Sequence, residues 1–344
     1  MADYTPDEQL YETLRASIAE SFATRRPLLT HLNADTTWLL SLPYPSTSPS
    51  SNGRAYYHIL LDPWLRGGQS DSSSVQTIAE VDEVIQRVEE AAHGYNIMCN
   101  VHVDHVDVGR DSQAGKCVDL VSISHEFTDH MHKDTLLEIS PRVPLMATTK
   151  AASMIKSWRH FDSVQEISPF SGDWRQSSRL PLPEWLGISR VAYPGKDLLY
   201  YHSAIVFIFA GLTMYSSPEA VIYAPHGVSP SDVQPLADAS PKVDTLALLH
   251  GLHDIKLVAK AQLNLDAYNG LKIQRKLKSK YWVGTHDEVK LGSGIVSWFL
   301  DRKVITVREA LQREGEENGG DAELAALAEV NFKNISNGEC LILE

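Results

Sequence analysis

Apolar segments of this chain repeatedly end in histidine, and this pattern constrains the fold more than any other feature. The densest example follows the apolar run Cys117–Ile123, where SISHEFTDHMHKDTL (122–136) holds three histidines and three carboxylates within ten residues. Other apolar runs lead into His226, His250 and His286. Because neighbouring strand ends share one edge of a sheet, the loops there can converge on a single site. Imidazole and carboxylate groups together suit Zn²⁺ or a similar divalent ion.

The apolar patterning predicts a chain in which strands and helices are mixed. Strands are expected at 36–40, 56–61, 101–108, 117–123, 202–209, 220–223, 245–249 and 339–343, and helices at 6–25, 79–93, 148–160, 261–279, 306–314 and 320–330. His132 is expected at the start of a short helical turn after the histidine-rich loop. A length of 344 residues allows one large α/β domain or two smaller ones.

The net charge of the chain disfavours some classes of binding partner. A net charge of -13 argues against a nucleic-acid backbone or an anionic membrane as partner, and a small-molecule substrate, even an anionic one, remains compatible. No run approaches the ~20 apolar residues of a membrane span. The three cysteines, Cys99, Cys117 and Cys340, form no metal-type CxxC, and the acidic start lacks a secretory signal. These features predict a reduced, cytoplasmic protein.

A series of segments resembles, in family order, the metallo-β-lactamase superfamily, in the branch typified by L-ascorbate-phosphate lactonase and its fungal and plant relatives. The family motif His-x-His-x-Asp-His corresponds here to His125-Glu126-Phe127-Thr128-Asp129-His130. The flanking segments that match are Thr30–Leu40, which looks like the first strand, Ile59–Pro63, Tyr201–Ser203, Val221–Gly227 and Tyr281–His286.

The resemblance implies an α/β fold, a metallo-β-lactamase-like four-layer αβ/βα sandwich with its site at one sheet edge. It covers residues 28–300. Residues 1–27 would then be an N-terminal helical extension, and residues 301–344 a C-terminal extension of helix and strand packed on the same domain.

The resemblance also implies a set of metal ligands, namely His125, Asp129, His130, His202, His226 and His286. Two positions depart from the family pattern. Phe127 stands in place of the second motif histidine, and His226 in place of the aspartate that bridges two metals. Because a neutral imidazole offers one lone-pair nitrogen, it cannot bridge as a carboxylate does. We therefore expect one ion rather than two, Zn²⁺ first, with Mn²⁺ or Fe²⁺ as alternatives.

The leading hypothesis is a metal-dependent hydrolase of a small ester, lactone or thioester. Asp129 would ligate the ion or act as base, and His202 or His250 would donate to the oxyanion or the leaving group. One alternative is a catalytically silent binding or regulatory member of the fold, which the two departures favour. The other is a metal-dependent lyase or isomerase.

Overall fold

The computed structural model describes the chain in eleven ranges, and it divides the chain into two compact units. The described residues are 24–33, 35–46, 48, 53–65, 75–98, 115–192, 202–210, 217–257, 261–287, 300–317 and 330–344. Unit 1 comprises Met1–Glu166 with Ile335–Glu344, and unit 2 comprises Ile167–Asn334. The expected strand 101–108 lies outside the described residues, as do all but the last residues of the expected helices 6–25 and 320–330. The expected domain boundaries stay a prediction.

Unit 1 has one seven-stranded sheet, with strand order β16-β1-β2-β3-β4-β5-β6. Its strands are β1 (Leu28–Asn33), β2 (Thr37–Pro43), β3 (Tyr56–Leu61), β4 (Leu120–Ile123), β5 (Leu145–Ala147), β6 (Val164–Glu166) and β16 (Cys340–Ile342). Its described helices are α2 (Ile78–Met98), α3 (Lys133–Glu138) and α4 (Thr149–Trp158). The strands β3 to β6 are parallel, and the others are antiparallel.

The segment Thr30–Leu40 is not a single strand, so the interpretation drawn from the resemblance is wrong at this point. It contains parts of β1 and β2, which pair antiparallel with Leu29 opposite Leu40. The chain reverses at Asp35, whose φ of 102° lies in the left-handed region that single turn residues occupy. Apolar residues stand close to the turn on both sides, Leu32 before it and Trp38 to Leu40 after it, so their spacing alone does not reveal it.

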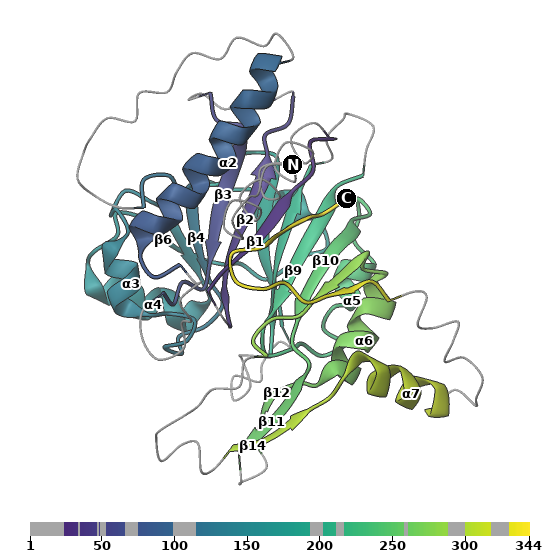
Figure 1. Cartoon of the computed structure of the whole chain (residues 1–344). Helices are drawn as coiled ribbons and strands as arrows, with labels where there is room; N and C mark the ends of the chain where they lie inside the picture. Colours follow the sequence, from purple (N-terminus) through teal and green to yellow (C-terminus); the bar gives the residue numbers. More distant parts are fainter. Residues whose placement is uncertain are drawn as a thin grey trace, which may run out of the picture. The chain divides into compact units, whose positions relative to one another are not determined.

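Unit 2 has a six-stranded sheet of order β15-β13-β10-β9-β8-β7 and a three-stranded sheet of order β12-β11-β14. The strands are β7 (Leu186–Val191), β8 (Ala204–Phe209), β9 (Glu219–Ala224), β10 (Asp244–His250), β11 (His253–Leu257), β12 (Gln262–Asn264), β13 (Tyr281–Val283), β14 (Leu300–Val304) and β15 (Phe332–Lys333). The described helices are η1 (Trp174–Ser177), α5 (Gln234–Ala237), α6 (Ala267–Leu277) and α7 (Val307–Glu317). Figure 1 shows both sets of elements.

The expected helix 261–279 is too long at its start. Residues Gln262–Asn264 form β12 instead, which pairs antiparallel with β11. The helix α6 begins only after Asp266, whose side chain accepts a hydrogen bond from the Asn269 backbone N–H at 2.9 Å. Such an N-cap satisfies one of the donors left unpaired at a helix start. This correction bears on the site, because it places Asn264 on a strand.

Helices cover each large sheet through apolar side chains. In unit 1, Ile78, Val81 and Ile85 of α2 belong to a buried cluster with Leu39 and Leu60 of the sheet. Figure 1 shows α2 running along this sheet. In unit 2, Ile273 and Leu277 of α6 pack in one cluster with Ile222 and Leu248. Both units thus bury a sheet face under amphipathic helices, as the 3.6-residue period predicts.

The parallel strands decide where polar residues gather. In unit 1, β3, β4 and β5 are parallel neighbours, and in unit 2, β9, β10 and β13 are parallel neighbours. Their carboxyl ends therefore lie along one edge within each unit, which is where ligands bind in open α/β sheets. The histidine-ended runs of the sequence correspond to these strand ends.

A buried polar network stabilises the start of β3 in unit 1. The Glu89 carboxylate of α2 accepts the Ala55 and Tyr56 backbone N–H groups at 2.7 and 3.0 Å, and it lies 3.0 Å from Nε2 of the fully buried His58. The other ring nitrogen of His58 lies 2.8 Å from the Ser41 hydroxyl. Burial raises the pKa of Glu89, but His58, the Ala55 N–H and Arg54 outweigh it and leave that pKa below its usual value.

We expect Glu89→Gln to lower the free energy of unfolding by about 3 kcal/mol at neutral pH. Because the pKa of Glu89 is lowered in the folded state, its stabilisation is present above the unfolded value of about 4.3 and is lost as the pH falls through the folded value. The difference between parent and variant should therefore shrink below about pH 4. Urea unfolding from pH 7 to pH 3 measures this, with Glu90→Gln on the exposed side of the same helix as control.

Candidate metal centre

In unit 1, the strand ends are joined by the buried carboxylate of Asp62, which directly follows β3. It accepts the Ser124 backbone N–H at 2.7 Å and the Ser124 hydroxyl, and its Oδ2 lies 2.6 Å from Nδ1 of His130. Asp62 and His130 are both fully buried. Since an ionised carboxylate only accepts hydrogen bonds, it holds the His130 proton on Nδ1. The lone pair of His130 is then on Nε2.

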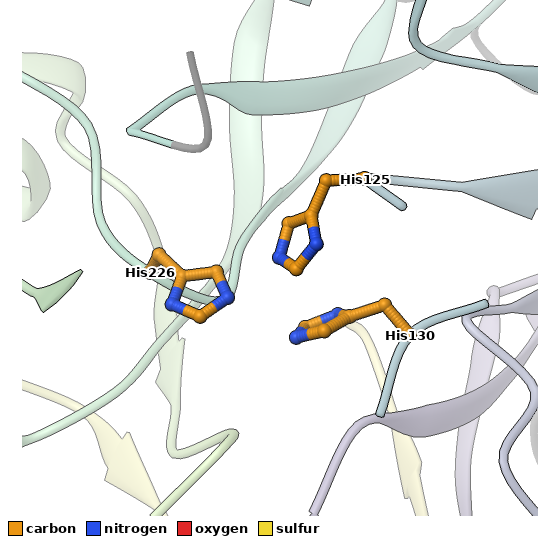
Figure 2. A group of neighbouring side chains, drawn as sticks. All are labelled: His125, His130 and His226. Atoms are coloured by element: carbon orange, nitrogen blue, oxygen red, sulfur yellow. The ribbon is translucent and has the colours of Figure 1, made fainter. Parts of the chain in front are cut away.

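The histidine-rich loop carries three further residues of interest. The rings of His125 and His130 lie 3.8 Å apart between centroids, and Phe127 contacts His125 edge-on at 4.8 Å. Figure 2 shows the two imidazoles next to each other. Nδ1 of His125 accepts the Phe127 backbone N–H at 3.3 Å, so the neutral ring carries its proton on Nε2. Thr36 donates its hydroxyl to the main-chain carbonyl of the half-buried Asp129.

His132 lies at the start of α3, as expected. It is the N-cap of this helix, and its Nδ1 accepts the Thr135 backbone N–H at 3.4 Å. This hydrogen bond gives His132 a structural role in ending the loop.

In unit 2, His226 and His286 come together at the strand ends. Their ring centroids lie 4.8 Å apart at an interplanar angle of 77°. Nδ1 of His226, the third imidazole drawn in Figure 2, lies 2.8 Å from Oδ1 of Asn264 on β12. Since this amide oxygen accepts, the His226 proton is on Nδ1 and the lone pair on Nε2. His226 and His286 are both buried.

The loop that carries His286 is held by its neighbour Asp287. The Asp287 carboxylate accepts the backbone N–H groups of Leu252 and His253 at 2.6 and 3.2 Å. These bonds fix the loop after β13 to the loop after β10.

Two residues at these strand ends have backbone angles that residues other than glycine rarely adopt. The φ of Asp62 is 41° and that of His286 is 59°. Left-handed backbone at residues other than glycine costs of order 1 kcal/mol and gathers at functional sites. At Arg159 and Lys278 the same conformation is explained by helix C-caps. Asp62 and His286 cap none of the described helices, so their strain supports a functional role for these loops.

His202 and His250, both expected to donate protons, have partners within unit 2. Nε2 of His202 donates to the Leu263 carbonyl at 3.0 Å. His250 is completely buried, with Nδ1 2.7 Å from the Gly251 carbonyl and Nε2 2.8 Å from the Asn269 side-chain amide. Burial lowers the pKa of both rings. These contacts favour a structural role for His250, and the catalytic roles of both residues stay predictions.

Three residues around the histidines were not among the predicted site residues. Asp62 lies within the matching segment Ile59–Pro63, and an aspartate before a proline at a strand end is the signal that marks it. Asp287 adjoins His286 and was not assigned a role. No sequence pattern indicates a role for Asn264, because its segment, 261–279, is expected to be helical. All three hold a site loop or ring by hydrogen bonds.

Comparison with known proteins identifies the fold. No protein-family model and no curated protein matches the sequence. Among solved structures, a possible metal-dependent hydrolase from Veillonella parvula superposes with a TM-score of 0.52 at 12% identity, over 92% of this chain and 100% of that one. A variant of the CmlA β-hydroxylase gives 0.50 at 13% identity, over 100% of this chain and 65% of that one. The metallo-β-lactamase fold protein YhfI from Bacillus subtilis gives 0.44 at 11%, over 92% and 99%.

What the chain shares with the Veillonella protein and the CmlA variant is the fold. The expected α/β fold is confirmed, with a helix-covered sheet in each unit, and the Veillonella structure shares this fold over nearly the whole chain. The metallo-β-lactamase type of the fold stays a prediction. At these identities the likeness extends to no substrate and no reaction. Among the helices in the described ranges, none has the length and apolar character needed to cross a bilayer.

We expect Asp62→Asn to disturb the single tautomer of His130, because an amide can donate as well as accept. Imidazole ¹H–¹⁵N spectra report which ring nitrogen carries the proton. The parent should show a protonated Nδ1, and the variant a mixture or the reverse. Asp82→Asn is the control, since the Asp82 carboxylate accepts the Gly115 and Cys117 N–H groups. An unchanged His130 tautomer in the folded Asp62→Asn protein would refute the assignment.

Proposed function

We propose that the chain is a metal-dependent hydrolase of a small ester, lactone or thioester. The observation that carries this proposal is the state of two imidazoles: His130 and His226 each donate Nδ1–H to a fixed oxygen, from Asp62 and Asn264. Metal-binding histidines almost always have such a partner, which leaves Nε2 as the ligand atom. Metal-dependent hydrolysis is also the activity suggested in the name of the similar Veillonella protein.

The donor set fits a divalent ion. Two groups of ligand-capable residues are candidates for holding this ion. One is His125, His130 and His226, and the other is Asp129, His130 and His286. The first requires the proton of His125 to leave Nε2, which breaks its contact with the Phe127 N–H. The second requires no such change. We therefore propose Asp129, His130 and His286 as ligands, joined by His226.

Three imidazoles and one carboxylate are a nitrogen and oxygen set that suits zinc in a mononuclear site. We propose Zn²⁺, with Mn²⁺ or Fe²⁺ as alternatives, and one ion per chain. His226 in the position of the family's bridging aspartate, and Phe127 in that of an imidazole, support this stoichiometry.

A bound ion would supply Lewis acidity to a carbonyl oxygen and lower the pKa of a water molecule towards neutrality. Residues of the chain would hold and donate the protons. Asp129 would hold the proton of the attacking water, and its loop is held by Thr36. His125, whose neutral ring carries its proton on Nε2, would donate to the substrate carbonyl. His202 is the candidate donor to the leaving group, and its Nε2–H would have to leave the Leu263 carbonyl to play this part.

The side chain of Phe127, 39% exposed beside His125, supports a substrate with an apolar portion. We propose a small neutral or anionic carbonyl compound of the lactone class, in line with the sequence resemblance. The net charge of -13 disfavours a nucleic-acid partner.

We expect the purified parent to hold about one zinc per chain, and His130→Ala and His226→Ala to lose it together with hydrolysis of an ester and lactone panel. Loss of the hydrogen-bond partner of a ligand typically lowers metal affinity ~10- to 100-fold, and loss of the ligand itself should lower it at least as much. His132→Ala is the matched control, because its ring caps α3 and should leave both readouts unchanged. Elemental analysis and circular dichroism of the four proteins measure the outcome.

Each other outcome selects a different function. Two tight equivalents per chain would rule out the mononuclear site. A folded parent that never binds metal would make the chain a silent binding protein. A metal-dependent product without ¹⁸O from labelled water would indicate a lyase or isomerase.

We expect Phe127→His to raise metal affinity or stoichiometry, because it restores an imidazole next to His125 where the resembled family has one. Competition with a chelator measures the affinity in parent and variant. Phe127→Leu is the control for the loss of the aromatic ring alone. Equal metal binding in all three proteins would contradict the role assigned to this position.

A further inference from the structure

A lysine-rich pocket lies at the end of the unit 2 sheet where β9 and β10 begin. Its volume is about 350 Å³, within the range of roughly 300–1,000 Å³ of small-molecule sites. Its rim includes Glu219 and Asp244, the first residues of the two strands, which pair side by side. At about 3.3 Å per residue, the six residues of β9 separate this rim from the His226 end by roughly 20 Å. The pocket is thus distinct from the candidate metal centre.

The last turn of α6 and the turn that leads to β13 bring three lysines to the pocket. The helix ends at Leu277, and Lys278 follows in a left-handed C-cap with φ of 52°. The Lys280 backbone N–H donates to the Thr245 carbonyl of β10 at 3.1 Å. This hydrogen bond fixes the turn to β10, and Lys276, Lys278 and Lys280 line one cavity.

The charge of this pocket opposes that of the chain. Lys242 is paired with Asp244 at 2.9 Å. Within the described residues, Lys276, Lys278 and Lys280 take part in no ion pair, while the whole chain carries a net charge of -13. A lysine in the last turn of α6 also favours the helix dipole, but Lys278 and Lys280 lie beyond the helix. The four lysines of the lining outnumber its two carboxylates, Glu219 and Asp244, so the pocket still presents a local positive field to an incoming ligand.

The wall of the pocket is apolar. Leu236, Val243 and Leu277 line it, are at most 9% exposed, and belong to the buried cluster of unit 2. An ion without an apolar portion would leave this wall unused. We propose that the pocket binds a small phosphate monoester, whose dianionic head meets the lysines and whose apolar body contacts Leu236 and Leu277. Lysine binds phosphate as a point charge and needs no bidentate geometry.

Titration calorimetry with phenyl phosphate tests the proposal, in the presence of a chelator so that no metal ion can bind the phosphate. We expect saturable binding at one site that weakens with ionic strength. The triple variant Lys276→Gln, Lys278→Gln, Lys280→Gln should bind at least tenfold more weakly. Phenol and inorganic phosphate should each bind more weakly than phenyl phosphate, because each lacks one half of the recognised structure.

Two control variants test whether phenyl phosphate binds at this pocket and not elsewhere on the chain. Lys156→Gln removes the same charge from the exposed side of α4 in unit 1 and should leave binding unchanged. His226→Ala should also leave it unchanged, since that residue lies at the other strand end. The proposal is overturned if phenyl phosphate does not bind, if the folded triple variant binds as the parent does, or if His226→Ala alone abolishes binding.

Discussion

The geometry of the candidate site in unit 1 depends on one buried carboxylate, that of Asp62. A buried charge is costly unless donors surround it, and here the donors are Ser124 and His130. In addition, the Thr37 hydroxyl donates to the main-chain carbonyl of Asp62 at 3.2 Å. Asp62 thus connects the start of β2 and the residues after β3 and β4 with the histidine-rich loop, and it sets the tautomer of His130.

In unit 2, the group that orients the imidazole is neutral. Asn264 orients His226 as Asp62 orients His130, but an amide carries no charge. A carboxylate partner makes an imidazole a more basic ligand than an amide partner does. His130 should therefore be the strongest nitrogen ligand of the proposed centre, and His226 the more easily exchanged one.

The buried or capping histidines of the described chain differ in whether a ring nitrogen is left for a ligand. His250 is enclosed, and both of its ring nitrogens have partners in unit 2. His132 caps a helix, and His58 belongs to the network around Glu89. A strand end brings a side chain to the edge of a sheet, but the local hydrogen-bond partners decide whether its lone pair is left for a ligand.

Apolar periodicity and the order of motifs determined the α/β class, seven of the sixteen described strands and the strand ends at which His125, Asp129, His130, His226 and His286 lie. These follow from sequence because a strand end and its side chains are local properties. Only the tertiary structure decided the rest: the turn at Asp35, the strand at Gln262–Asn264, and the partners that fix each imidazole tautomer. Asp62 and His130 are 68 residues apart in the chain. Their contact exists because parallel strands bring distant residues to one edge, and no local pattern encodes which donor meets which acceptor there.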